Sequence, residues 1–267
     1  MNRLQSKTFA IARDVRAKSL HLMILACALL IGSSPATAQD YEEWSAEVRT
    51  SLSFRVSEAA ILPLLPPGWS VRPIADAPGK VNISLTFMDR YLILDTQGEQ
   101  VRTGASRYMV ISTQASNEES GLSGVMIING ISPEGTGAYE VYQTALIART
   151  ERSHSGLGEE SASSAETWEF AAESGDRVLL NLRYLSAPPV RRQTSIVIRS
   201  GLRPDFTRTY HIDQSSDRLG IPGSPDNRIE SLSFTAEGPL FSAIFDGTEV
   251  LTGVTSTPWY NREIFIP

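Results

Sequence analysis

The sequence predicts a mainly β domain, a large antiparallel barrel or cone-like sheet with a few short helices. Apolar and polar residues alternate in many short runs, most clearly over residues 81–87, and this alternation is typical of strands with one buried face. The turn sequences Ser174-Gly175-Asp176 and Asp246-Gly247 separate such runs and favour hairpins. Long amphipathic segments do not occur, so a parallel α/β architecture is not expected.

The alternation places the expected elements along the chain. A short helix is expected to begin after Ser57, which fits an N-cap, and to end before residues 66–68. Loops are expected at residues 153–165 and 214–227, where Ser, Gly and Pro gather. Strands are expected at residues 52–56, 81–87, 108–113, 124–131, 139–148, 166–171, 177–185, 194–199, 207–213, 229–235, 240–245, 249–255 and 263–266.

The first 38 residues have the composition of a cleavable secretion signal. A basic stretch precedes an apolar run over residues 20–31, which is shorter than the ~20 residues that cross a bilayer. Ala36-Thr37-Ala38 then fits the small-residue cleavage pattern, so the mature chain is expected to begin at Gln39. A lipoprotein anchored through Cys27 is the alternative, although the apolar run continues past that residue. We expect export to the periplasm or the extracellular space, with residues 39–267 as one β-rich domain.

Charge, cysteine and histidine usage exclude several kinds of partner and site. The signal segment takes five of the 24 basic residues and one of the 30 acidic residues with it, which leaves a net charge near −10. Nucleic acid is therefore not an expected partner, and we do not expect the domain to insert stably into a membrane. Cys27 is the sole cysteine, so the domain has no disulfide and no thiol nucleophile. His154 and His211 lack the spacing of metal ligands, and we expect no metal and no cofactor.

Residues 52–87 show a recognisable order of elements. A strand, a short helix, the block LLPPGW at residues 64–69 and an alternating strand follow one another. This order resembles the opening of the acetoacetate decarboxylase-like family, and weaker resemblance extends over most of residues 39–267. The resemblance implies a large antiparallel barrel. It also implies decarboxylation through a Schiff base between a buried lysine and a keto acid.

The sequence departs from that family at the residues that carry its chemistry. No lysine follows Lys80, which lies in the turn-like segment of residues 77–80. The family places a glutamate shortly after a strand tyrosine, whereas this chain has Met109 and Val110 after Tyr108. We therefore expect a relative that keeps the scaffold without Schiff-base decarboxylation.

Candidate ligand-binding residues gather near predicted strand ends. Arg107, Arg149 and Arg152 are candidate carboxylate clamps, because a guanidinium donates two parallel hydrogen bonds. Tyr108 and Tyr142 are expected in the wall of a ligand cavity, and Glu140 belongs to the same polar cluster. Solvent-facing strand charges that contribute little to stability are the alternative interpretation.

Other polar groups have weaker functional patterns. His211 and Asp213 share one face of a predicted strand and fit either an oriented general base or a surface pair. No Gly-x-Ser-x-Gly sequence indicates a hydrolase nucleophile, although a spatial Ser-His-Asp triad stays open. Residues 259–262 are expected to anchor the last strand or to close one end of the barrel, with packing as the main role.

These patterns predict an exported protein that binds a small organic molecule in a barrel, with a carboxylate as one candidate. An enzyme on the same scaffold, a lyase or hydrolase that uses Glu, His, Tyr and Arg, is the alternative. A structural or interaction domain with a filled core is the third hypothesis. The sequence is compatible with an oligomer and does not indicate one.

Overall fold

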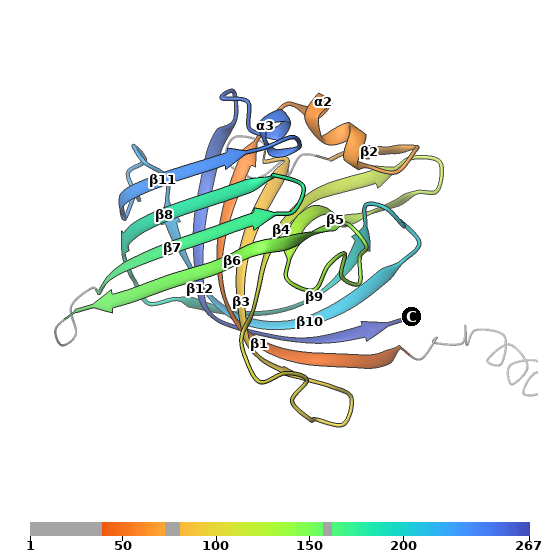
Figure 1. Cartoon of the computed structure of the whole chain (residues 1–267), viewed down its shortest axis with the longest axis horizontal. Helices are drawn as coiled ribbons and strands as arrows, with labels where there is room; N and C mark the ends of the chain where they lie inside the picture. The colour runs from red at the N-terminus through yellow and green to blue at the C-terminus, as the bar shows by residue number, and fades with distance from the viewer. Residues whose placement is uncertain (1–38, 73–80, 157–161) are drawn as a thin grey trace, which may run out of the picture. The chain divides into compact units, whose positions relative to one another are not determined.

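A computed structural model describes residues 39–72, 81–156 and 162–267 (Figure 1). The predicted signal segment, Cys27 and Lys80 lie outside the described residues. Strands dominate the described residues, which confirms the mainly β prediction. The elements are β1 (Asp40–Arg55), α2 (Glu58–Ile61), the 3-10 helix η1 (Leu62–Leu64), β2 (Trp69–Val71), β3 (Ile83–Leu94), β4 (Ser106–Asn117), β5 (Leu122–Ser132), β6 (Tyr142–Ser155), β7 (Ser163–Ala172), β8 (Arg177–Leu185), β9 (Val190–Ser200), β10 (Thr207–Gly220), β11 (Ile229–Glu237), α3 (Phe241–Ile244) and β12 (Val250–Ile266). Within the described ranges, no helix is long and apolar enough to span a bilayer.

Seven strands close into a ring. They pair in the order β5-β9-β10-β12-β1-β3-β4, and β4 pairs again with β5. These pairings are antiparallel except β5–β9, which is parallel over three residue pairs. We call this set of strands the inner ring. Strands β6, β7, β8 and β11 continue from β5 as an outer sheet, which Figure 1 shows stacked against the long strands of the ring. The short strand β2 pairs with β4.

Alternate residues of the inner-ring strands belong to two different cores. In β3, Leu85 and Phe87 face the outer sheet, and the ring of Phe87 stacks on that of Trp168 at 5.8 Å between centroids. Met88, the next residue, belongs instead to a second cluster inside the ring, together with Tyr108 of β4. This alternation follows from the two-residue period of a strand. It decides which side chains can enter a cavity inside the ring.

The prediction of a strand at residues 240–245 is wrong, because Phe241–Ile244 form α3. The carboxylate of Asp176, in the turn between β7 and β8, accepts hydrogen bonds from the backbone N–H groups of Leu240 and Phe241 at 2.9 and 3.1 Å. This acceptor, distant in the sequence, satisfies donors at the start of a helical turn, where a strand would need a ladder partner. The turn at residues 246–247 consequently joins α3 to β12 and does not form a hairpin, whereas the turn at residues 174–176 does join β7 to β8.

Other element boundaries also differ from the expected ones. Residues 214–220, predicted as part of a loop, extend β10, where Asp217 is buried and forms an ion pair with Arg228. The two predicted strands at residues 249–255 and 263–266 are one continuous strand, β12. Residues 139 and 140, predicted within a strand, precede β6, and Glu140 has a positive φ of 59° that fits a turn. Ser57 precedes α2 as predicted, but its side chain makes no capping hydrogen bond.

Candidate functional site

The inner ring encloses a cavity of about 270 Å³. Side chains from all seven ring strands line it, and the connection between β5 and β6 covers part of it with Glu134 and Tyr139. Lysine is absent from the described lining, because no described residue is a lysine. The positive charges of the described lining are therefore carried by arginine side chains.

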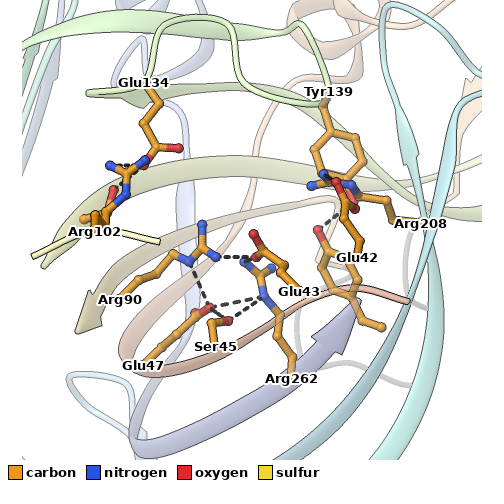
Figure 2. A network of polar contacts seen from close by, with 12 residues as sticks. Glu42, Glu43, Ser45, Glu47, Arg90, Arg102, Glu134, Tyr139, Arg208 and Arg262 are labelled. Carbon is orange, nitrogen blue, oxygen red and sulfur yellow. Dashed lines mark hydrogen bonds and ion pairs between the residues drawn. The ribbon is translucent and has the colours of Figure 1, made fainter. Parts of the chain in front are cut away.

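Charged side chains gather on three adjacent strands, β12, β1 and β3 (Figure 2). The fully buried Glu47 of β1 holds this cluster together. One of its oxygens accepts a hydrogen bond from Arg49 Nε at 2.7 Å, and the other lies 3.1 Å from Arg262 Nε and 3.4 Å from Arg90 Nε. Ser45 donates a further hydrogen bond to Glu47 at 2.7 Å. Glu47 thus orients three guanidinium groups at the cavity wall.

The charges around Glu47 keep it ionised. Burial by itself would raise the pKa of Glu47, but the positive charges of Arg262, Arg49 and Arg90 outweigh that effect and, with the Ser45 hydrogen bond, lower the pKa to about 2. Burial likewise disfavours the charged form of Arg262, and the charge of Glu47 nevertheless raises the pKa of Arg262 well above its ordinary value. Both groups are therefore charged over the whole physiological pH range.

A further arginine of the cavity, Arg208, lies on β10 beside two phenols. Arg208 forms an ion pair with Glu42 and lies over the ring of Tyr139, 5.6 Å from its centroid. The hydroxyl oxygens of Tyr139 and Tyr210 are 2.6 Å apart. Burial, followed by the neighbouring Tyr210, raises the pKa of Tyr139 well above 10, so its phenol stays protonated. Because one hydroxyl donates to the other, the pair keeps one O–H that can donate to a ligand.

The fixed charges at the cavity sum to a positive value. Among the residues that the structure describes, four guanidinium groups line the cavity and three carboxylates contact them, while Arg102 and Glu134 form a separate neutral pair. One net positive charge remains. The terminal nitrogens of Arg262 make no hydrogen bond within the described residues, and the nearer carboxylate, that of Glu43, is 3.8 Å away. Arg262 therefore has donors available for an anion.

The structure brings together only some of the residues that the sequence nominated. Tyr108 and Tyr142 line the cavity, with ring centroids 5.9 Å apart. Arg107 of the ring strand β4 and Arg152 of the outer-sheet strand β6 both form ion pairs with Asp89 of β3, at 3.3 and 2.6 Å. Neither of them lines the cavity.

Two further nominated residues lie at the protein surface. Arg149 is 63% exposed and forms an ion pair with Glu151. Glu140 forms an ion pair with Arg203 at 3.0 Å, and both side chains are close to half exposed. Whether any nominated residue binds a ligand stays a prediction, but only Tyr108 and Tyr142 are placed to do so in this cavity.

The histidine and C-terminal patterns also have definite positions. Asp213 accepts hydrogen bonds from Arg191 at 2.9 and 2.5 Å, which lower its pKa to about 2, so it does not orient His211. His211 is half exposed and lies 3.9 Å from Glu263. In the segment of residues 259–262, Tyr260 and Arg262 enter the cavity, a larger role than the strand anchor that the sequence indicated.

Sequence reasoning missed Glu47, Arg49, Arg90 and Arg208 as site residues. Each is a charged residue within a strand, and such residues ordinarily face solvent. The available signal was a run of polar residues at every second position, which places them on one face of the strand. These residues are Glu43, Ser45, Glu47 and Arg49. The opposite face of the same strand is apolar from Leu52 onward. A strand with one apolar and one polar face has the same pattern whether its polar face is enclosed by the protein or exposed to solvent.

Comparison with known proteins adds information on the fold. No protein-family model and no curated protein matches the sequence. The solved structure of MppR, an enduracididine biosynthesis enzyme with HEPES buffer bound, has a TM-score of 0.50 and 13% identity over 89% of this chain and 90% of MppR. MppR complexed with pyruvate has a TM-score of 0.49 and 14% identity, over 88% of this chain and 91% of that structure. An acetoacetate decarboxylase-like enzyme from Sphingomonas wittichii RW1 has a TM-score of 0.49 and 11% identity, over 88% of this chain and 96% of that enzyme. At such identities the similarity concerns the fold alone, and the TM-score of 0.50 shows that the chain has the fold of MppR.

Proposed function

We propose that the protein is exported and binds a small organic anion, anchored by a carboxylate, inside the inner ring. The observation that carries this proposal is the convergence of four arginines on one cavity that keeps a net positive charge. A cavity lined by aromatic and apolar side chains with a few convergent polar groups is typical of small-molecule sites.

Arg262 is the group we assign to the carboxylate. Its Nε is held by Glu47 at 3.1 Å and faces Ser45 Oγ at 3.2 Å, which fixes the plane of the guanidinium. Its CZ atom lies 4.6 Å from the centroid of the Tyr210 ring. The terminal nitrogens, which make no hydrogen bond within the described residues, are then left to donate two parallel N–H groups to a carboxylate. A site of this kind recognises the anion without forming a covalent bond to it.

We further propose that the site works without a Schiff base. A Schiff base needs a neutral amine in the cavity, and no described lining residue supplies one. Lys80 lies outside the described residues and is the one lysine left after the predicted signal. The chemistry implied by the family resemblance is therefore not proposed for this protein.

The affinity for carboxylates tests the proposed site. We expect Arg262→Lys to weaken binding of propionate and 3-phenylpropionate by about tenfold or more, because an ammonium cannot replace two parallel N–H donors. Isothermal titration calorimetry measures this in Tris, since a structural neighbour was determined with HEPES bound. Arg149→Lys, which changes an exposed arginine outside the cavity, is the matched control and should leave the affinity unchanged. Equal affinities for Arg262→Lys and the unchanged protein would rule out Arg262 as the anchor.

Intact-mass measurement tests both export and the missing Schiff base. The secreted protein should begin at Gln39, and borohydride reduction with pyruvate present should add no mass, because none of the described lining residues carries an amine. A lipid-modified chain that begins at Cys27 contradicts the cleavage site. A reduced pyruvate adduct on Lys80 contradicts the exclusion of Schiff-base chemistry.

An enzyme on the same scaffold is the second candidate. The observation in its favour is the pair of buried phenols, Tyr139 and Tyr210, 2.6 Å apart beside Arg208. A neutral phenol can donate a proton to an anion that an arginine holds nearby, which is a step of many lyase reactions. Conversion of the bound carboxylate, followed by proton NMR and abolished in Tyr210→Phe, would favour the enzyme over the binding protein.

A further inference from the structure

We propose that the ligand is an amphipathic monocarboxylate, with one charged end and an uncharged, largely apolar body about the size of a single six-membered ring with a short chain. This inference rests on the proposed function and specifies its ligand class. It follows from how the charges, the apolar side chains and the volume of the cavity are distributed.

Charged and apolar lining residues come from opposite parts of the inner ring. The adjacent strands β10, β12, β1 and β3 contribute Glu43, Arg49, Arg90, Arg208 and Arg262. The strands β4, β5 and β9 are also adjacent, because the ring closes between β4 and β5. None of the described lining residues from these three strands is charged, and they include Val110, Val125, Ile127, Ile196 and Ile198. The cavity therefore has one charged wall and one apolar wall.

The apolar wall has no role in binding a small, fully hydrated anion. Valine and isoleucine side chains stabilise a complex only through the apolar surface that binding removes from water. This contribution is roughly 25 cal/mol per Å². A ligand that reaches from Arg262 to Ile196 and Ile198 gains that contribution, and a short hydrophilic acid does not. The wall thus selects for an apolar body opposite the carboxylate.

The charge balance limits the ligand to one carboxylate. One net positive charge faces the cavity once the ion pairs are counted, and the lining also includes the carboxylates of Glu43 and Glu134. A second carboxylate on the ligand would lie against the apolar wall or near these two glutamates. Burial of an unpaired charge and repulsion between like charges both disfavour that arrangement.

The cavity volume limits the size of the body. The volume of about 270 Å³ is just below that of typical ligand pockets, which span about 300–1,000 Å³. A single substituted ring fits such a space, whereas the body of a much longer ligand would extend through the open side of the cavity into solvent. 3-Phenylpropionate combines the required charge, apolar body and size.

Titration calorimetry with four compounds tests the ligand class. 3-Phenylpropionate should bind about tenfold or more tightly than propionate, glutarate and 3-phenylpropionamide. Propionate lacks the body, glutarate carries a second charge and the amide lacks the charge. If none of the four binds, the proposed function itself fails. If propionate binds and 3-phenylpropionate binds no tighter, or glutarate binds best, anion binding stands and the amphipathic ligand class is overturned.

Variants of the apolar wall give an independent measurement. Ile196→Thr and Val125→Thr should lower the affinity for 3-phenylpropionate about fivefold while leaving that for propionate unchanged, because only the ring contacts this wall. Val197→Thr is the matched control on β9, since Val197 is 45% exposed and does not line the cavity. An unchanged ratio of the two affinities in both wall variants would contradict the assignment of the apolar wall to the ligand body. Retained propionate binding verifies that each variant is folded.

Discussion

Replacing Glu47 with glutamine is expected to lower the free energy of unfolding by about 3–5 kcal/mol. Glu47 is fully buried and contacts Arg49, Arg90 and Arg262. Glutamine has nearly the same shape but no charge, so the variant would leave buried guanidinium groups without their common counter-ion. Removal of one partner from a buried ion network costs far more than removal of a surface charge.

Urea unfolding of the two proteins at pH 7 measures this difference. Glu151→Gln is the control, because Glu151 is 62% exposed and also pairs with an arginine, Arg149. The control should change stability by at most about 0.5 kcal/mol. If Glu47→Gln were as mild as Glu151→Gln, the assignment of Glu47 as the group that holds the arginine cluster would be wrong.

The stability contributed by Glu47 is expected to disappear in acid. Its pKa is about 2 in the folded protein and 4.5 as its ordinary value, so the folded state favours the ionised form. A lowered folded-state pKa stabilises the protein above the unfolded pKa, and this stabilisation is lost as the pH falls from about 4.5 toward 2. Each tenfold change in proton affinity is worth about 1.4 kcal/mol, so the contribution at neutral pH is about 3 kcal/mol.

The comparison with Glu47→Gln isolates this titration from all others, because glutamine does not ionise. The difference in unfolding free energy between the two proteins should be constant from pH 7 to about pH 5 and should shrink steadily from pH 4.5 to 2.5. Urea titrations at half-unit pH intervals give the curve. A difference that stays constant down to pH 2.5 would show that Glu47 is not the ionised centre of the cluster.

Much of the fold could be predicted from local patterns, because strand alternation and turn residues act over few residues. The alternation at residues 81–87 predicted β3, and Ser174-Gly175-Asp176 predicted the turn between β7 and β8. The failure at residues 240–245 has a non-local cause. There the hydrogen bonds from Leu240 and Phe241 to Asp176 stabilise a helical turn, and Asp176 is more than 60 residues away in the sequence.

The candidate site was much less predictable, because the interior of the ring is itself partly polar. Alternation distinguishes the two faces of a strand but does not say which face is enclosed when both are covered. Arg107 and Tyr108 are neighbours in β4, and only Tyr108 lines the cavity, since Arg107 faces Asp89. Arg262 and Glu47 are 215 positions apart and meet only because β12 pairs with β1. Closure of the ring, which no local pattern encodes, creates the site.

The most direct test of the proposed anion site is a crystal structure of the protein grown with 3-phenylpropionate. We expect both carboxylate oxygens to lie about 2.7–3.0 Å from the terminal nitrogens of Arg262, and the phenyl ring to pack against Ile196 and Ile198. A carboxylate bound to other groups, or an unchanged cavity at a concentration that saturates binding in solution, would contradict it.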